Sequence, residues 1–187
     1  MFTVAFQAAG AEDTFSVFNG PGICLTLGGR IALKRGQALV LACTAGLSNP
    51  ADYNAAGEFC RIGAAVSGSH PGSSTRSYCG ATLERQNGPV RRVAGIYCRS
   101  GTAALFGTSA LADDTFFTTK TEIEVSFTHD LVCSFRFRKV GAAVWTAGAA
   151  SQTLHGMTAQ QVWFGVGHGI CNNVSNATIE DVSIRIE

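Results

Sequence analysis

The chain has 187 residues, a formal net charge of +1 and a charged fraction of 14%, against about 25% in an average domain. The length fits one domain over residues 1–187, because single β-sandwiches commonly reach this size. Nucleic acid is not expected as a partner, since phosphate neutralisation needs a concentrated basic face, and the densest basic spot is Arg91-Arg92. No apolar run approaches the roughly 18 residues of a membrane span.

The amino-terminal sequence and the seven cysteines bear on the compartment. The start lacks a basic segment and carries Glu12 and Asp13, so we expect no secretion signal. An odd number of cysteines without such a signal favours reduced thiols and synthesis in a cytosol-like compartment. No Cys-x-x-Cys motif occurs, so we expect buried free thiols and no zinc site.

Apolar patterns of period two, separated by glycine-rich turns, predict β-strands along the whole chain. The expected strands cover residues 2–6, 14–18, 23–27, 31–33, 37–44, 78–85, 90–99, 103–109, 122–127, 131–138, 142–146, 162–166 and 182–187. Residues 37–44 are almost continuously apolar, which predicts burial on both faces of that strand. The best helical candidate is 45–59, where Pro50 suits a first helical position and Gly57 limits the helix to one or two turns. This pattern favours an all-β antiparallel sandwich or jelly roll.

The clearest pair of strands is joined by a turn at residues 128–130. In the first strand apolar residues alternate with Glu122 and Glu124, and in the second they alternate with Arg136 and Arg138. Because opposite charges on neighbouring strands stabilise the pair, we expect the glutamates to face the arginines across a hairpin.

The end of the chain predicts another regular strand. Val182, Ile184 and Ile186 alternate with polar residues. This pattern predicts a half-buried strand with the three apolar side chains on its buried face.

From Thr118 onward, the order of these strands resembles the second half of concanavalin A-like, laminin-G-type jelly rolls. FTTKTEIEVSF leads to LVCSFRFRKVGAAVWT and then to the aromatic-glycine strand VWFGVGHG. In the closing strand, Ala177–Ile184 resembles the pattern Gly-x-Ile-Asp-Asp-Val-x-Ile of that family. The resemblance implies one concanavalin A-like antiparallel β-sandwich. The family includes lectins, glycan-binding modules, glycoside hydrolases and non-catalytic structural domains, so the fold alone does not choose the function.

Laminarinase-like hydrolases on this fold carry a strand of the form Glu-x-Asp-x-x-Glu or Glu-x-Asp-x-Glu, whose alternate carboxylates act as nucleophile and acid. The similar run here, residues 122–127, lacks the third carboxylate, because Ser126 and Phe127 occupy the two places available to it. No Gly-x-Ser-x-Gly motif occurs. We therefore expect no enzymatic activity and no catalytic residue.

The acidic and histidine residues predict no cofactor and no metal centre. The four histidines, His70, His129, His155 and His168, are scattered without metal-ligand spacing. Asp113-Asp114 and Glu180-Asp181 are acidic pairs that offer oxygen ligands to Ca²⁺. Neither pair lies in a loop rich in Asp, Asn and Gly, so calcium stays an alternative to the expected absence of a cofactor.

Two functions remain open. Low charge, reduced cysteines and a jelly roll that fills the chain favour a non-catalytic structural or assembly protein. Within this class we expect a virus or phage particle component, for example a capsid decoration, head-fibre or tail-associated protein. It would lie on the particle surface and would have other subunits of the assembly as partners.

The alternative is a lectin-like carbohydrate-binding module with glycans as partners. Sugar sites stack exposed aromatic rings on sugar faces and bond the hydroxyls with Asn, Asp and Arg. The aromatic candidates are Tyr53, Tyr78, Trp145 and Trp163, although the strand position of Trp163 favours the core. The predicted glycan site comprises Arg76, Tyr78, Asn172 and Asn173.

Overall fold

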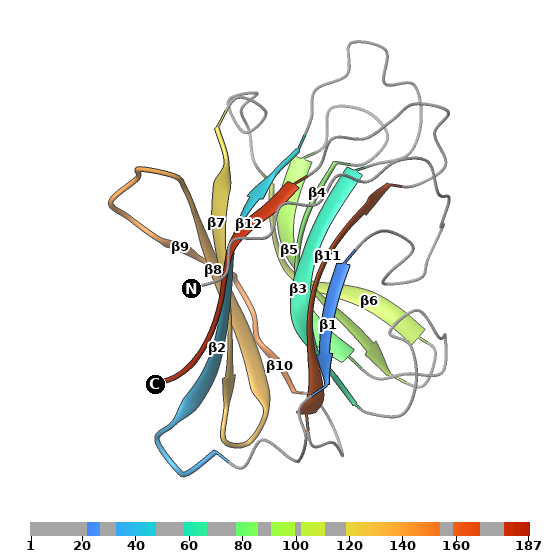
Figure 1. Ribbon diagram of the computed structural model, residues 1–187, viewed down its shortest axis with the longest axis vertical. Coiled ribbons are helices and arrows are strands. Elements are labelled where there is room, and N and C mark those ends of the chain that lie inside the picture. Colours follow the sequence, from blue (N-terminus) through green and yellow to red (C-terminus); the bar gives the residue numbers. More distant parts are fainter. Residues whose placement is uncertain are drawn as a thin grey trace.

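The structure is a computed structural model, and it describes residues 22–26, 33–47, 58–66, 78–85, 91–99, 102–110, 119–153, 159–168 and 178–187. Within these segments the chain consists of strands and turns without a helix, and every strand pairing is antiparallel. The strands form two sheets that pack face to face (Figure 1). The predicted all-β antiparallel sandwich is therefore confirmed.

One sheet, called sheet A here, has the strand order β1-β11-β3-β4-β5-β6. Its strands are β1 (Gly22–Thr26), β3 (Glu58–Val66), β4 (Tyr78–Arg85), β5 (Arg91–Arg99), β6 (Thr102–Ala110) and β11 (Ala159–His168). The other, called sheet B, has the order β10-β8-β7-β2-β12, and β9 pairs with β8. Its strands are β2 (Ala38–Gly46), β7 (Thr121–Thr128), β8 (Val132–Lys139), β9 (Thr146–Ala147), β10 (Gln152–Thr153) and β12 (Thr178–Ile186).

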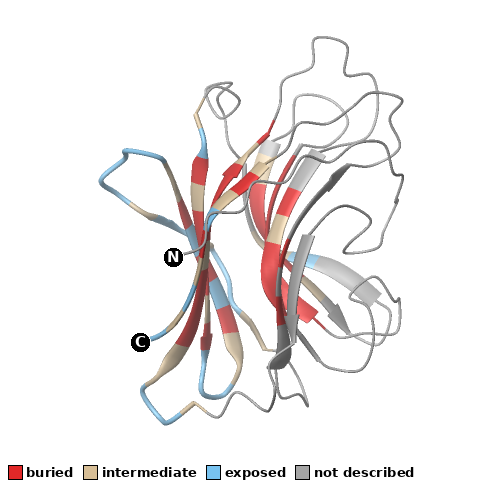
Figure 2. Cartoon of the chain, viewed as in Figure 1, coloured by how far each residue is buried: buried red, intermediate tan, exposed pale blue. Residues whose placement is uncertain are grey.

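The core lies between the facing sides of the two sheets, and Figure 2 shows buried residues along the strands of both sheets. Phe127 of β7 and Phe164 of β11 are fully buried there. Burial of a side chain of this kind contributes about 1.5–3 kcal/mol. Val40 and Leu41 are neighbours in β2 and point to opposite faces, and both are buried. The predicted burial of residues 37–44 on both faces is thus confirmed for this strand.

Two aromatic rings join the sheets on one side of the core. Phe106 of β6 packs edge-on against Phe135 of β8, with ring centroids 5.9 Å apart. Two glycines leave room for these rings: a Cβ atom at Gly95 would lie 2.4 Å from the Phe106 ring, and one at Gly148 would lie 2.4 Å from the Phe135 ring. Part of the glycine content therefore serves close side-chain packing.

The expected helix over residues 45–59 is wrong at both ends. Ala45 and Gly46 complete β2, while Glu58 and Phe59 begin β3, and residues 48–57 lie outside the described part. Strand β3 itself was not predicted. Its core-facing residues Cys60, Ile62 and Ala64 alternate with Arg61 and Gly63, so the apolar alternation is present but short.

The strand expected over residues 142–146 is wrong, because a turn leads here into the two-residue strand β9. Gly141 adopts a φ of 85°, and the amide of Ala142 donates to the carbonyl of Lys139 at 2.9 Å. The chain bends back so that Thr146 pairs with Phe137 in the two-residue strand β9. The predicted strands over residues 2–6 and 14–18 lie outside the described residues.

The closing strand is confirmed as β12, but the predicted burial of its apolar residues is only partly right. Val182 is buried, whereas Ile184 is 38% and Ile186 is 58% exposed. These isoleucines pair with Leu41 and Leu39 of β2, whose side chains lie in the core. They are exposed because β12 ends the described order of sheet B, so the described strands cover β12 from one side alone.

Candidate functional site

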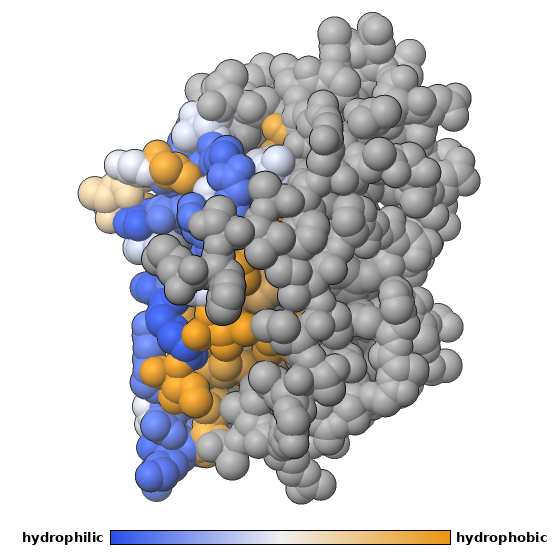
Figure 3. Space-filling model, viewed as in Figure 1, coloured by the Kyte–Doolittle hydropathy of each residue, from blue (hydrophilic) through white to orange (hydrophobic). Residues whose placement is uncertain are grey.

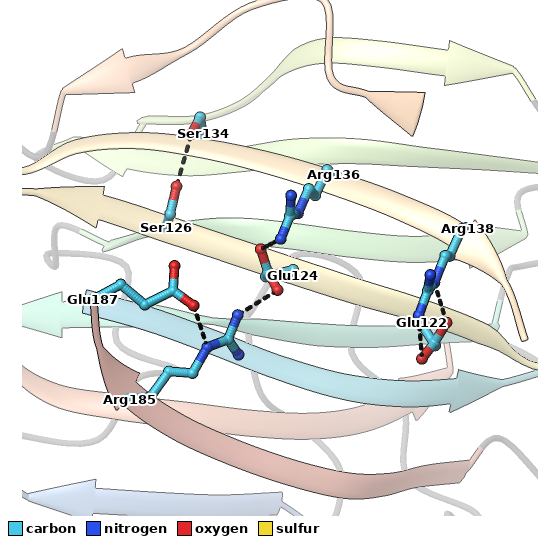
Figure 4. A network of polar contacts seen from close by, with 8 residues as sticks. All are labelled: Glu122, Glu124, Ser126, Ser134, Arg136, Arg138, Arg185 and Glu187. Carbon is cyan, nitrogen blue, oxygen red and sulfur yellow. Dashed lines mark hydrogen bonds and ion pairs between the residues drawn. The ribbon is translucent and has the colours of Figure 1, made fainter. Parts of the chain in front are cut away.

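The outer face of sheet B, turned away from the core, carries a ladder of ion pairs. Strands β7 and β8 place Glu122 opposite Arg138 and Glu124 opposite Arg136, so the predicted hairpin pairing is confirmed. The Glu122 carboxylate binds the Nε and Nη2 groups of Arg138 together, and Glu124 Oε1 lies 2.5 Å from Arg136 Nη2. Figure 4 shows how these side chains lie across neighbouring strands.

The ladder continues onto β12. Arg185 Nη2 donates to Glu124 Oε2 at 2.6 Å, and Arg185 Nε donates to Glu187 Oε1 at 2.6 Å. The hydrogen bond to Glu187 raises the pKa of Arg185, and the hydrogen bond to Glu122 raises the pKa of Arg138. Since each arginine is matched by a carboxylate, this face offers donors and acceptors with little net charge.

The return from β8 to β9 places an indole ring on this ladder. The guanidinium carbons of Arg136 and Arg138 lie 4.7 and 4.4 Å from the ring centroid of Trp145. The carboxylates hold the guanidinium groups, and the guanidinium groups contact the indole ring. The Trp145 side chain is therefore ordered before a ligand binds, so binding loses little side-chain entropy. We call Trp145, Arg136, Arg138, Glu122 and Glu124 the Trp145 platform.

The platform has the chemistry of a site for polar, ring-shaped ligands. Trp145 is half-buried, and its neighbour Val144 is 78% exposed on the same hairpin. An indole ring offers an apolar face for the C–H groups of a sugar ring. The adjoining carboxylates accept and the guanidinium groups donate hydrogen bonds, so both roles that a sugar hydroxyl can take are served.

The outer face of sheet A carries a second polar cluster, which is buried. Arg92 Nη2 lies 2.5 Å from Glu84 Oε1, and Arg61 Nη2 lies 4.0 Å from Glu84 Oε2. Thr82 donates its hydroxyl to Glu84 at 3.3 Å. Glu84 is 6% exposed and Thr82 is fully buried. This cluster therefore contributes to the packing of the outer face of sheet A and offers little surface to a ligand.

The expected exposure of Tyr78 is wrong. Tyr78 begins β4, is 5% exposed, and belongs by strand alternation to the same outward row as Thr82 and Glu84. Its part in glycan binding stays a prediction. Arg76, Asn172 and Asn173 lie outside the described residues.

Strands β4 and β11 both pair with β3, but the start of β4 and the end of β11 lie at opposite ends of β3. Tyr78 pairs with Ala65, which pairs with Gln161 near the start of β11. The end of β11, His168, pairs instead with Glu58 at the other end of β3. Sequence reasoning named Trp145 as a sugar-binding aromatic, but it did not connect Trp145 with the charged pairs of the hairpin.

Neither described acidic residue of the Glu180-Asp181 pair stands free. Glu180 binds Lys120 at 2.5 Å, and Asp181 accepts a hydrogen bond from Thr44 at 3.3 Å. Within the described segments, no three His, Cys, Asp or Glu side chains are grouped to hold a metal ion. Asp113-Asp114 lies outside them. Nor does the described part of the chain contain a helix long and apolar enough to cross a membrane.

Comparison with known proteins finds similar solved structures. No family model and no curated protein matches the chain. Among solved structures, the CBM2 module of the evolved Dit protein of Lactobacillus casei BL23 phage J-1 has a TM-score of 0.58 and 12% identity, over 96% of this chain and 76% of that one. A legume lectin-like domain from Entamoeba histolytica has a TM-score of 0.56 and 4% identity, over 99% and 83% of the two chains.

A bifunctional GH43-CE protein from Bacteroides eggerthii also matches, with a TM-score of 0.58 and 9% identity. The match covers 99% of this chain but 21% of that protein, so the chain corresponds to about a fifth of its length. At these identities the likeness shows the fold alone. The fold is a concanavalin A-like, lectin-like jelly roll, as the resemblance of the closing strands implied.

Proposed function

We propose that this chain is a non-catalytic carbohydrate-binding module and that the Trp145 platform is its binding surface. The observation that carries the proposal is the position of the Trp145 ring, 4.4 Å from Arg138 and 4.7 Å from Arg136, next to paired carboxylates. The similarity to a CBM2 module of a phage protein and to a legume lectin-like domain supports a glycan as the ligand.

The absence of catalysis is part of the proposal. Glu122 and Glu124 are the carboxylates on the strand that resembles a hydrolase motif, and arginines bind both of them. These glutamates therefore act as positioning residues for the arginines and the indole ring.

A glycan array with four proteins, the unmodified chain and three variants, tests the proposal. The unmodified protein should bind a set of glycans, Trp145→Ala should lose that binding, and Val144→Ala on the same hairpin should retain it. Arg76→Ala tests the site predicted from the sequence. If Arg76→Ala loses binding and Trp145→Ala keeps it, the function stands and the platform is not the site. A blank array for the unmodified protein would count against carbohydrate binding.

The second candidate is the assembly function, which we propose for β12. Ile184 and Ile186 are large, exposed apolar residues, and Figure 3 shows hydrophobic atoms gathered between the polar surface of sheet B and the rest of the molecule. Such a patch suits contact with another subunit, for example in a virus or phage particle.

Sedimentation velocity tests this second candidate. An assembly subunit should be oligomeric at micromolar concentration, and Ile186→Lys should shift it toward the monomer. A specific interface is expected to bury about 1,000 Å² or more. An unmodified protein that is monomeric at every concentration, alone and with candidate particle proteins, would rule out this function without affecting carbohydrate binding.

A further inference from the structure

The opposite charges on the outer face of sheet B lie at different depths. The Glu124 side chain is 10% exposed, whereas the side chains of its two partners, Arg136 and Arg185, are 46% and 36% exposed. Glu122 and Arg138 differ little, at 30% and 27%. A ligand that approaches Glu124 therefore meets guanidinium groups before it meets the carboxylate between them.

Glu124 serves two arginines at once, as Figure 4 shows. Its Oε1 lies 2.5 Å from Arg136 Nη2, and its Oε2 accepts a hydrogen bond from Arg185 Nη2 at 2.6 Å. Arg185 has a second carboxylate, because its Nε donates to Glu187. A guanidinium group carries several N–H donors in a planar fork that matches an oxyanion. Arg136, which shares one carboxylate and is the most exposed of the three side chains around Glu124, therefore has donors left for a further anion.

The neighbours of Arg136 leave the approach to it open. On one side Arg136 pairs with Ala147 of β9, and residues 140–151 of that hairpin include no charged residue. On the other side Ser134, the next outward position of β8, is exposed. Its hydroxyl lies 2.9 Å from that of Ser126. Hydroxyl groups donate hydrogen bonds to anions, so these serines add to the donors around Arg136.

The exposed carboxylates of sheet B oppose an anion at this point only weakly. Glu122 is bound by both Nε and Nη2 of Arg138, which compensates its charge. Asp130 lies in the turn before β8, and Glu187 follows the end of β12, where its backbone pairs with that of Ala38. Solvent and salt screen charges at such exposed positions.

We propose that the ligand of the Trp145 platform is an acidic glycan, and that Arg136 binds its carboxylate or sulfate group while the sugar ring stacks on Trp145. This inference rests on the proposed function and names the class of glycan. The guanidinium carbon of Arg136 lies 4.7 Å from the centroid of the indole ring, so the cation adjoins the stacking surface. Uronic acids and sulfated sugars carry their anionic group on the sugar ring or next to it. One sugar unit therefore reaches both side chains.

The charge of the ligand should decide its affinity. A hydrogen bond between a guanidinium group and an anionic oxygen is roughly twice as strong as one between neutral groups. A neutral sugar keeps the stacking on Trp145 and loses this term. The platform should therefore discriminate between glycans that differ in one anionic group alone.

Matched pairs of glycans test the proposal. The array carries uronic-acid oligosaccharides beside their carboxyl-reduced forms, and sulfated oligosaccharides beside their desulfated forms. The unmodified protein should bind the acidic member of a pair at least about tenfold more tightly, and the pair that responds tells a carboxylate from a sulfate ligand. In calorimetric titrations, affinity for the acidic member should fall between about 0.05 and 0.5 M sodium chloride, whereas that for the neutral member should stay nearly constant.

Three variants assign the anion to Arg136. Arg136→Gln should lose at least about tenfold in affinity for the acidic member and retain its affinity for the neutral one. Arg136→Lys keeps the positive charge, so it should keep the salt dependence. Lys120→Gln is the matched control, because the Lys120 side chain is 47% exposed and bound to a glutamate of sheet B, Glu180, outside the platform. It should bind both members as the unmodified protein does.

The outcomes separate this inference from the proposed function. Equal binding of acidic and neutral members, lost for both in Trp145→Ala, would overturn the acidic ligand and leave the platform as a glycan site. An acidic preference that persists in Arg136→Gln would show that the anion binds elsewhere. Absence of binding to every glycan would contradict the proposed function itself, and the acidic ligand with it.

Discussion

The outer faces of the two sheets use the same side-chain chemistry in opposite surroundings. On sheet A, the Glu84 side chain is 8% exposed and binds Arg92. On sheet B, the side chains of Glu122 and Arg138 are 30% and 27% exposed. A buried carboxylate depends on its partners, because water cannot replace them. Glu124 of sheet B is also buried. The comparison indicates that the cluster of sheet A is committed to stability, whereas the pair of Glu122 and Arg138 on sheet B remains accessible.

The largest expected effect comes from Glu84→Gln. The substitution leaves Arg92 and Arg61 beside a neutral amide in a buried row, so the free energy of unfolding should fall by about 3 kcal/mol. Urea unfolding followed by tryptophan fluorescence measures the change. The matched variant Glu122→Gln should leave the midpoint almost unchanged, since water solvates the exposed arginine that remains. Equal losses for the two variants would remove the distinction between the faces.

Buried thiols in the core between the two sheets should make the folded protein less stable at alkaline pH. Burial raises the pKa of Cys43 and of Cys133 above the ordinary value of 9.0. These thiols stay protonated in the folded protein and ionise in the unfolded one, so their contribution is present below pH 9.0 and is lost as the pH rises. Each thiol should lower the free energy of unfolding by about 1.4 kcal/mol per pH unit above that value.

Urea unfolding at pH 8, 9 and 10 checks this slope. Cys43→Ala removes one thiol, so its stability should fall less steeply with pH than that of the unmodified protein, whatever its stability at pH 8. An identical slope in the variant would place the alkaline sensitivity elsewhere, for instance in the ion pairs of the two faces.

Salt should affect the ion pairs of the two faces differently, with a smaller change in the free energy of unfolding. Dissolved ions screen the partly exposed pair of Glu122 and Arg138 on sheet B but reach the buried pair of Glu84 and Arg92 poorly. Raising sodium chloride from 0.05 to about 1 M should therefore leave the destabilisation of Glu84→Gln nearly constant. A loss of that effect in high salt would show that the cluster is in contact with solvent.

The sequence predicted the fold best where pairing is local. The hairpin of β7 and β8 follows from alternation on both sides of a short turn, and its register matches the predicted ion pairs. The burial of β12 did not follow, because it depends on the place of that strand in the sheet. A register shift between Glu180 and Ser183, where Asp181 has a φ of 49°, adds an irregularity that alternation does not signal.

The site was predicted in parts. Glu122, Arg138 and Trp145 each had a sequence signal, but their association depends on the turn at Gly141, which precedes residues 142–146 that the sequence predicts as a strand. The burial of Tyr78 could not be foreseen, since the polar stretch before it predicts an exposed loop. The burial of outward-facing side chains depends on the strands and loops that cover them, and this is a property of the whole fold.

The most direct test of the central claim follows the indole N–H signal of Trp145 by nuclear magnetic resonance while oligosaccharides bound on the array are added. The signal is assigned by its loss in Trp145→Ala. It should shift in a saturable way, and Trp145→Ala should bind the same sugar at least about tenfold more weakly. An unchanged Trp145 signal in the presence of a sugar that the protein binds would contradict the assignment of the platform as the binding surface.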